Sequence, residues 1–267
     1  MGISYFFRVL RERGYEKRFI AYTISMEEIT VTERAANDKN VGYLLATLAS
    51  AADDLGGKIF RHADDARSVL TIRVPEEGAD YLRSETEDRI ADVIAVRYKY
   101  DFFRRRIRPD GIEGLKRELL FSALIAADLA EDKRYIMRKL RLFREYAIDG
   151  IWNFRLAALK RKWTDIVGYI PAYFDEKRLK DFIVYLVGEK RGRKVVVENG
   201  NVYDKNFNLL RRSDLIDATG EGKLVREVIL SGGGSVELIG NVPSLDEKYL
   251  REYFGSSVVI SASRRQT

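Results

Sequence analysis

The spacing of hydrophobic residues changes twice along the chain, and this change constrains the fold more than any other feature. From Gly111 to Gly188 the apolar residues recur at the three- and four-residue spacing of amphipathic helices. On both sides of this segment, short runs of β-branched and aromatic residues alternate with helical stretches, which indicates strands and helices. We therefore expect an α+β fold with a mixed N-terminal region (1–108), a central basic helical bundle (109–193) and a small α/β C-terminal region (194–267).

The first 108 residues mix helix and strand signals. The pattern predicts, in chain order, a short helix over 3–13, strands over Phe19–Ser25 and Ile29–Arg34, a helix that begins at Asn37 or Asp38 and stops at Gly56-Gly57, a hairpin of Lys58–His62 and Ser68–Val74, and a long helix over Glu76–Ile107. The turn-forming run Pro109-Asp110-Gly111 then ends this region.

The remaining two regions predict different elements. The helical region is expected to contain helices over Leu115–Ala130, Lys133–Ile148, Ile151–Val167 and Asp175–Val187. The pattern after it predicts a hairpin of Lys194–Glu198 and Val202–Asp204 extended by Phe207–Leu210, a helix over Lys223–Leu230, a strand over Ser235–Ile239, a helix from Ser244 to about Phe254 and a last strand over Val258–Ser261. A helix between the last two strands would let them pair in parallel through a crossover.

Two residue counts exclude most familiar catalytic sites. The 267 residues include no Cys and a single His, while 46% are hydrophobic, enough to bury a core. The absence of Cys excludes disulfides, thiolate metal sites and cysteine nucleophiles. A single His excludes zinc sites with several His ligands, and it leaves His62 as the one imidazole for a Ser-His-Asp arrangement. We interpret His62 as a residue at the end of a strand.

The positive charge is concentrated in the middle of the chain. The formal net charge is +6, but residues 97–194 carry 25 basic and 14 acidic side chains, whereas both flanking segments are slightly acidic. Clustered cations can bind phosphates, and the Phe102-Phe103 pair beside them could stack on bases. The candidate polyanion site consists of Arg104, Arg105, Arg106, Arg108, Arg134, Arg138, Arg141, Lys160, Arg161 and Lys162. The same charges also fit an acidic protein partner, or solvated helix surfaces without a partner.

Glycine and aspartate motifs do not add a cofactor or a metal to this prediction. The run Gly220-Glu221-Gly222-Lys223 resembles part of a phosphate-binding loop, but Asp217 and Leu224 stand where that loop needs Gly and Ser or Thr. We interpret it as a turn before a helix. The pairs Asp53-Asp54 and Asp64-Asp65 are interpreted as solvated carboxylates rather than Mg²⁺ ligands.

One short segment carries a more specific signal. Residues 148–156 read Ile-Asp-Gly-Ile-Trp-Asn-Phe-Arg-Leu, and this segment resembles the Asp-Gly-x-x-Asn-Phe-Arg-Leu motif of the putative sporulation protein YtxC family of spore-forming Gram-positive bacteria. The matching residues are Asp149, Gly150, Asn153, Phe154 and Arg155, followed by Leu156. The resemblance implies a sporulation-associated role and no particular reaction. That family often ends in a cysteine-rich run, whereas this sequence ends in Ser261-Ala-Ser-Arg-Arg-Gln-Thr267.

The motif also has a purely structural interpretation. Asp149-Gly150 would end one helix and start the next, while Asn153 and Arg155 would tie this turn to neighbouring carbonyls or carboxylates. Phe154 and Leu156 would pack inside. The alternative is a binding surface at the helix junction.

These observations together favour binding over catalysis. The N-terminus lacks the apolar core of a signal peptide, and the longest uncharged apolar run, Leu119 to Ala127, is shorter than the about 18 residues that a membrane span needs. We therefore expect a non-enzymatic, cytoplasmic, sporulation-associated protein that binds a partner and spans no membrane. A nucleic-acid-binding protein is the alternative. An enzyme that relies on carboxylates, Lys, Arg and Tyr is the third possibility.

Overall fold

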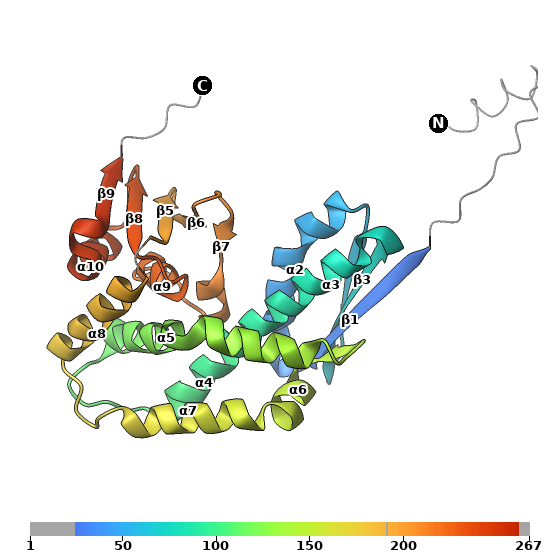
Figure 1. Cartoon of the computed structure of the whole chain (residues 1–267), viewed down its shortest axis with the longest axis horizontal. Helices are drawn as coiled ribbons and strands as arrows, with labels where there is room; N and C mark the ends of the chain where they lie inside the picture. Colours follow the sequence, from blue (N-terminus) through green and yellow to red (C-terminus); the bar gives the residue numbers. More distant parts are fainter. Residues whose placement is uncertain (1–24, 191, 262–267) are drawn as a thin grey trace, which may run out of the picture.

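A four-stranded sheet and a five-stranded sheet lie at opposite ends of the molecule, with helices packed between and below them (Figure 1). This computed structural model describes residues 25–190 and 192–261. It confirms the expected α+β class. The expected helix over 3–13 and all but the last residue of the expected strand Phe19–Ser25 lie outside the described residues.

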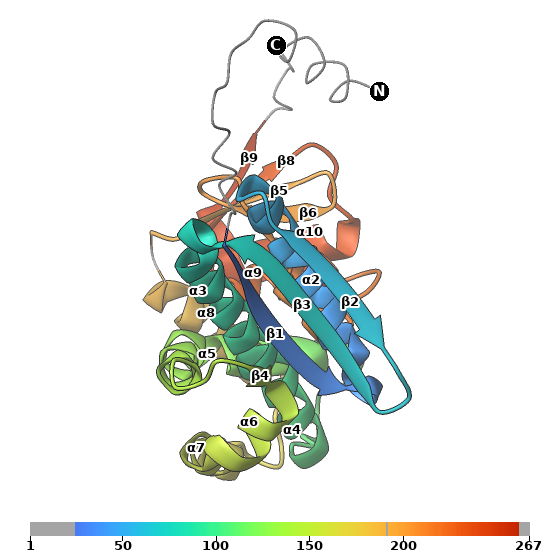
Figure 2. The ribbon, with the colours of Figure 1, turned by 90° about the vertical axis from the view of Figure 1, so that its right-hand side faces the viewer.

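The N-terminal sheet is mostly antiparallel. Its strands are, in spatial order, β2 (Lys58–Ala63), β3 (Arg67–Pro75), β1 (Met26–Arg34) and β4 (Tyr146–Ala147), of which only β4 runs parallel to its neighbour β1. Alternate residues of β1 and β3 are fully buried, among them Ile29, Val31, Leu70 and Ile72. Helices α2 (Asp38–Asp54) and α3 (Glu76–Asp92) cover this buried face (Figure 2). The expected hairpin and both helix starts are confirmed.

The long helix expected over Glu76–Ile107 contains a wider turn. α3 continues through a π-helical segment (Val93–Tyr98) into α4 (Lys99–Arg106). The residues Val93 to Val96 of this segment are fully buried, so its irregular backbone is held inside the core. The wider turn sets the direction of Tyr98 and of α4, and π-helical turns often lie next to functional sites.

The helix boundaries predicted for the central region are partly wrong. The expected helices Leu115–Ala130 and Lys133–Ile148 form one helix, α5 (Gly114–Leu140), with a kink at Asp128. The chain leaves the helix after Leu140 because Tyr146 is fully buried in strand β4, where its hydroxyl donates to Glu87 at 2.8 Å.

In contrast, the single helix expected over Ile151–Val167 is divided into two. It consists of α6 (Ile148–Arg155) and α7 (Ala157–Tyr169), which meet at Leu156. The Leu156 side chain is fully buried, and its backbone (φ −114°, ψ 33°) lies outside the helical region. α8 (Glu176–Glu189) follows as expected, and the Asp175 side chain caps it by accepting from the Arg178 N–H at 2.8 Å.

The C-terminal sheet follows the sequence prediction closely. Its strands are, in spatial order, β7 (Leu209–Leu210), β6 (Asn201–Asp204), β5 (Lys194–Glu198), β8 (Ser235–Ile239) and β9 (Val258–Ser261). The hairpin β5–β6 is antiparallel, and β8 and β9 are parallel, as the crossover through α10 (Ser244–Phe254) requires. Short 3-10 turns occur at Ala35–Asn37, Arg212–Ile216 and Gly255–Ser257. One continuous hydrophobic core extends through all three predicted regions.

The glycine-containing turn before α9 (Lys223–Leu230) is closed by a carboxylate of the same chain. Asp246, fully buried at the start of α10, accepts from the N–H groups of Gly222 at 3.1 Å and Val225 at 2.9 Å. A bound phosphate would use these same N–H groups at a helix start. The carboxylate therefore occupies the place where the phosphate-binding loop that this turn resembles would hold its ligand.

We expect Asp246→Ala to lower the free energy of unfolding by about 1–3 kcal/mol, because it leaves buried N–H groups of α9 without an acceptor. Denaturant unfolding followed by circular dichroism measures this loss. Glu247→Ala is the matched control, since the Glu247 side chain pairs, among the described residues, with Arg251 alone, an exposed ion pair worth less than about 1 kcal/mol. Equal losses in the two variants would contradict the capping role of Asp246.

Candidate anion-binding site

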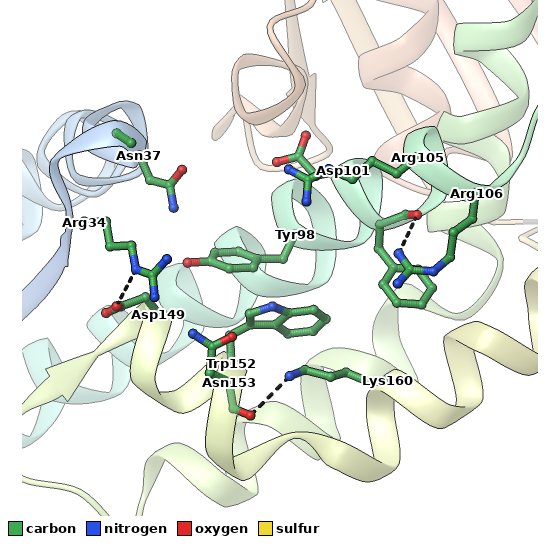
Figure 3. A pocket seen from close by; sticks show the side chains of 12 residues that line it. Arg34, Asn37, Tyr98, Asp101, Arg105, Arg106, Asp149, Trp152, Asn153 and Lys160 are labelled. Carbon is green, nitrogen blue, oxygen red and sulfur yellow. Dashed lines mark hydrogen bonds and ion pairs between the residues drawn. The ribbon is translucent and has the colours of Figure 1, made fainter.

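A pocket of about 450 Å³ opens where the end of β1 meets α4, α6 and α7 (Figure 3). We call it the α4–α6 pocket. Its wall includes Arg34 from the end of β1, Asn37 from the turn after it, Tyr98 and residues of α4, Trp152 and Asn153 from α6, and Lys160 from α7. Segments more than 100 residues apart in the sequence thus form one concave surface.

Three cations of this pocket have no carboxylate partner among the described residues. The Lys160 Nζ lies 4.6 Å from the centre of the Trp152 ring and donates to the Asn153 carbonyl at 3.2 Å. The Arg106 guanidinium lies 3.8 Å from the centre of the Phe102 ring and also donates to the carbonyl of that residue. Arg105 is exposed and forms no hydrogen bond or ion pair within the described part of the chain. The charge of all three is therefore available to a ligand.

The two carboxylates of the pocket are neutralised by other arginines. Asp149 accepts from Arg67 at 2.7 Å and from Arg34 at 3.1 Å. Burial alone would raise the pKa of Asp149, but these two guanidinium groups outweigh it and hold the pKa below its usual value. Asp101 accepts from Arg97 at 3.1 Å. The cations Lys160, Arg105 and Arg106 therefore give the pocket a net positive charge.

The aromatic residues at the base of the pocket are fixed by packing and hydrogen bonds. Trp152 stacks on Trp163, with ring centres 5.1 Å apart and planes at 29°, and lies 5.3 Å from Tyr98. The Tyr98 hydroxyl donates to the buried carboxylate of Glu33 at 2.8 Å, and Asn40 donates to the same carboxylate at 3.0 Å. Burial, together with the Glu33 charge, raises the pKa of Tyr98, so this residue is a neutral donor.

A buried ion cluster lies behind Trp163. The ammonium group of Lys99 is fully buried and pairs with Asp128 and, at 2.7 Å, with Asp132. Lys162 pairs with both of these carboxylates at 2.8 Å, and the Trp163 Nε1–H donates to Asp132 at 2.9 Å. The cluster joins α4, α5 and α7 and so fixes the walls of the pocket.

The structure brings only part of the predicted polyanion site together. Arg105, Arg106 and Lys160 line the α4–α6 pocket, whereas Arg104 and Arg108 line a second pocket of about 430 Å³ beside the end of α4. Lys162 belongs to the buried ion cluster instead. The remaining predicted residues are exposed and line neither pocket; they are Arg134, Arg138, Arg141 and Arg161.

Residues of the 148–156 motif line the same pocket, but the structural interpretation of this motif is partly wrong. Asp149 and Gly150 lie in the first turn of α6 and do not separate two helices. Phe154 is 80% exposed and does not pack inside, whereas Leu156 is fully buried as expected. Arg155 contacts no carboxylate of the described residues, and its guanidinium lies 5.8 Å from the centre of the Phe143 ring. The break falls at Leu156 because this side chain, rather than Phe154, enters the core.

Sequence reasoning missed Arg34, Tyr98 and Trp152 as residues of the site. Trp152 lies inside the motif, so its position next to Asn153 was the one available signal. Nothing in the sequence places Arg34, at the end of a predicted strand, beside a helix that begins more than 100 residues later.

The described residues contain no group of three or more His, Asp or Glu side chains placed to hold a metal ion. Within the same residues, no helix has both the length and the apolar character that crossing a membrane requires. A scan against protein-family models finds no match, and searches of curated proteins and of solved structures find no similar chain. The geometry of the site is therefore the basis for its interpretation.

Breaking the buried ion cluster is expected to destabilise the protein strongly. Asp132→Ala removes partners of Lys99, Lys162 and Trp163 and should lower the free energy of unfolding by about 3–5 kcal/mol. Denaturant unfolding measures the loss. The double variant Lys99→Met/Asp132→Leu should recover a large part of it, because it removes both buried charges. A double variant as unstable as the single one would contradict the electrostatic explanation.

The lowered pKa of Asp149 predicts a stability change at acidic pH. Its ion pairs stabilise the folded protein fully above the unfolded pKa of about 4, and this stabilisation is lost as the pH falls toward the lower folded value. The Asp149→Asn variant should therefore lose less stability than the wild type below about pH 4. Thermal unfolding across this range is the measurement, with Asp165→Asn, exposed on α7, as control. If the unfolding temperatures of the wild type and of Asp149→Asn changed in parallel with pH, the proposed contribution of the Asp149 ion pairs would be contradicted.

Proposed function

We propose that this protein acts by binding an acidic macromolecule through the end of α4, and that it does so in the cytoplasm during sporulation. The observation that carries the binding proposal is the arrangement of Arg104, Arg105, Arg106 and Arg108, which we call the arginine rim. All four are exposed, and none forms an ion pair with a carboxylate of the described residues. By contrast, Arg97 and Arg226 are paired with carboxylates.

The stability of helix α4 explains in part why the rim arginines lie at its end, but it does not account for their charge. Cations at the C-terminal end of a helix interact favourably with its dipole, which stabilises the rim without a partner. The dipole acts only within the last turn, and it does not neutralise the charge. An acidic surface would supply the missing counter-charges, and this supports a protein partner of acidic composition as the first candidate.

Nucleic acid is the second candidate because the rim extends beyond a single pocket. Arg105 and Arg106 face the α4–α6 pocket, while Arg104 and Arg108 face the second pocket together with Arg117. Positive charge on both sides of the end of one helix suits a chain with evenly spaced phosphates.

Catalysis has weaker support than binding. The α4–α6 pocket does contain ionisable residues with shifted pKa values, which an enzyme would need. However, Asp149 and Asp101 are held by arginines, and the Tyr98 hydroxyl already donates to Glu33. These groups therefore do not form a free acid and base facing each other.

The sporulation part of the proposal is supported by the resemblance of residues 148–156 to the YtxC family. Deleting the gene in a spore-forming source organism should lower the yield of heat-resistant spores relative to the complemented strain. An unchanged spore yield would remove this part of the proposal and leave the binding activity to be judged separately.

Binding through the rim predicts a specific response to salt and to mutation. Fluorescence titrations with an oligoglutamate peptide and with single-stranded DNA and RNA, at low and moderate salt, should show affinity for at least one of them that falls as salt rises. The variant Arg104→Ala/Arg105→Ala/Arg106→Ala should weaken this binding by about tenfold or more.

The matched control removes the same charge elsewhere. Arg134, Arg138 and Arg141 are exposed along the end of α5 and line neither pocket, so replacing all three by Ala should weaken binding much less. Equal losses in the two triple variants would show that net charge rather than the rim is responsible. If none of the three probes bound even at low salt, the proposal would be contradicted.

A further inference from the structure

The α4–α6 pocket has the size and shape of a site for a small molecule rather than for a flat surface of a partner. Its volume of about 450 Å³ lies within the range of ligand pockets, about 300–1,000 Å³. Four separate parts of the chain form its wall, and the buried ion cluster behind Trp163 holds α4 and α7 in place. A concave site on rigid elements can recognise a ligand by its shape as well as by its charge.

The charge of the pocket specifies an anionic group. Lys160 is half-buried, and burial lowers the pKa of its amine because no carboxylate in the described part of the chain compensates. Arg105 and Arg106 also lack a carboxylate partner among the described residues, while Arg34 is paired with Asp149 and Arg97 with Asp101. A partly desolvated ammonium group is costly without a counter-ion, so an anion bound beside Lys160 would offset this cost.

The aromatic rings of the pocket are not available for stacking with a base. Trp152 has Trp163 against one side and the Lys160 ammonium above its ring. The Phe102 ring is covered by the Arg106 guanidinium. These contacts orient Lys160 and Arg106, and they leave N–H groups rather than ring faces for the ligand. A compact anion such as a phosphate group fits this arrangement better than a nucleobase does.

The other side of the pocket offers amide groups. The Asn153 side chain is exposed and forms no hydrogen bond with the described residues. The Asn37 amide N–H donates to Glu33 and also faces the Tyr98 hydroxyl, and no donor among the described residues is bonded to the Asn37 side-chain oxygen. In Figure 3 both amides lie near Arg34 and Asp149, on the side away from Arg106. Side-chain amides both donate to and accept from hydroxyl groups.

We propose that the α4–α6 pocket binds a small phosphorylated sugar, with its phosphate beside Lys160, in a wall that also carries Arg105 and Arg106, and its hydroxyl groups toward Asn37 and Asn153. This inference rests in part on the proposed function, because the ligand shares Arg105 and Arg106 with the arginine rim. A bound sugar phosphate therefore competes with the macromolecule for these two arginines.

Isothermal titration calorimetry with glucose 6-phosphate, inorganic phosphate and glucose tests the chemistry of the ligand. We expect glucose 6-phosphate to bind more tightly than inorganic phosphate, and glucose to show no binding. Asn153→Ala should weaken binding of glucose 6-phosphate and leave that of inorganic phosphate unchanged. Glucose binding as tightly as glucose 6-phosphate, or no binding of either phosphate compound, would overturn the inference.

Variants of Lys160 test the location. Lys160→Met keeps an unbranched side chain over Trp152 but removes the charge, so it should weaken binding of glucose 6-phosphate by about tenfold or more. Lys160→Arg keeps the charge and should retain most of the affinity. Lys180→Met, on the exposed side of α8, is the matched control and should bind like the wild type. An affinity that is unchanged in Lys160→Met would place the ligand elsewhere and overturn the inference.

A second pair of variants separates this inference from the proposed function. Arg104→Ala/Arg108→Ala changes the rim outside the pocket, so it should weaken binding of the macromolecule and leave binding of glucose 6-phosphate unaffected. Lys160→Met should do the reverse. If the macromolecule binds through the rim but no sugar phosphate binds, only the ligand inference fails. If glucose 6-phosphate binds and the macromolecule does not, only the proposed function fails.

Discussion

The buried ammonium group of Lys99 is the interaction on which the central region depends. A charge taken fully out of water costs several kcal/mol unless it is paired, and here Asp128 and Asp132 of α5 supply the partners. Asp128 leaves helical geometry at this point, so the kink of α5 coincides with the ion pair. Lys162 of α7 pairs with both carboxylates, and Trp163 of α7 donates to Asp132. Three helices are thereby held in one relative position.

The geometry of the pocket depends on this ion cluster. Trp163, fixed by its hydrogen bond to Asp132, supports Trp152 by stacking, and Trp152 in turn supports the Lys160 ammonium. Arg106 is positioned in a similar way by the Phe102 ring. Lys160 and Arg106 are therefore held by aromatic faces instead of by carboxylates. This leaves them oriented and still charged, which is the combination that an anion site requires.

Local sequence patterns predicted much of the fold and much less of the site. Helix Lys223–Leu230 and strand Ser235–Ile239 have the predicted bounds, because their periodicity, turns and burial agree. The boundaries near Tyr146 and Leu156 failed because one buried side chain ends a pattern that still looks helical. The break expected between Ala130 and Lys133 failed because α5 continues past its kink at Asp128. Of the candidate site, Arg105, Arg106 and Lys160 were named as part of a larger basic set. Their separation from the other basic residues could not be read from the sequence.

The sequence by itself determined the α+β class, the concentration of basic residues in the middle of the chain, and the absence of thiolate chemistry. These follow from period and composition, which are properties of the chain before it folds. Only the tertiary structure decided which cations remain unpaired. Lys162 and Arg106 look alike in the sequence, but one meets three carboxylates and the other an aromatic ring. The physical reason is that an ion pair forms between residues that folding brings together, and no local pattern records which residues those are.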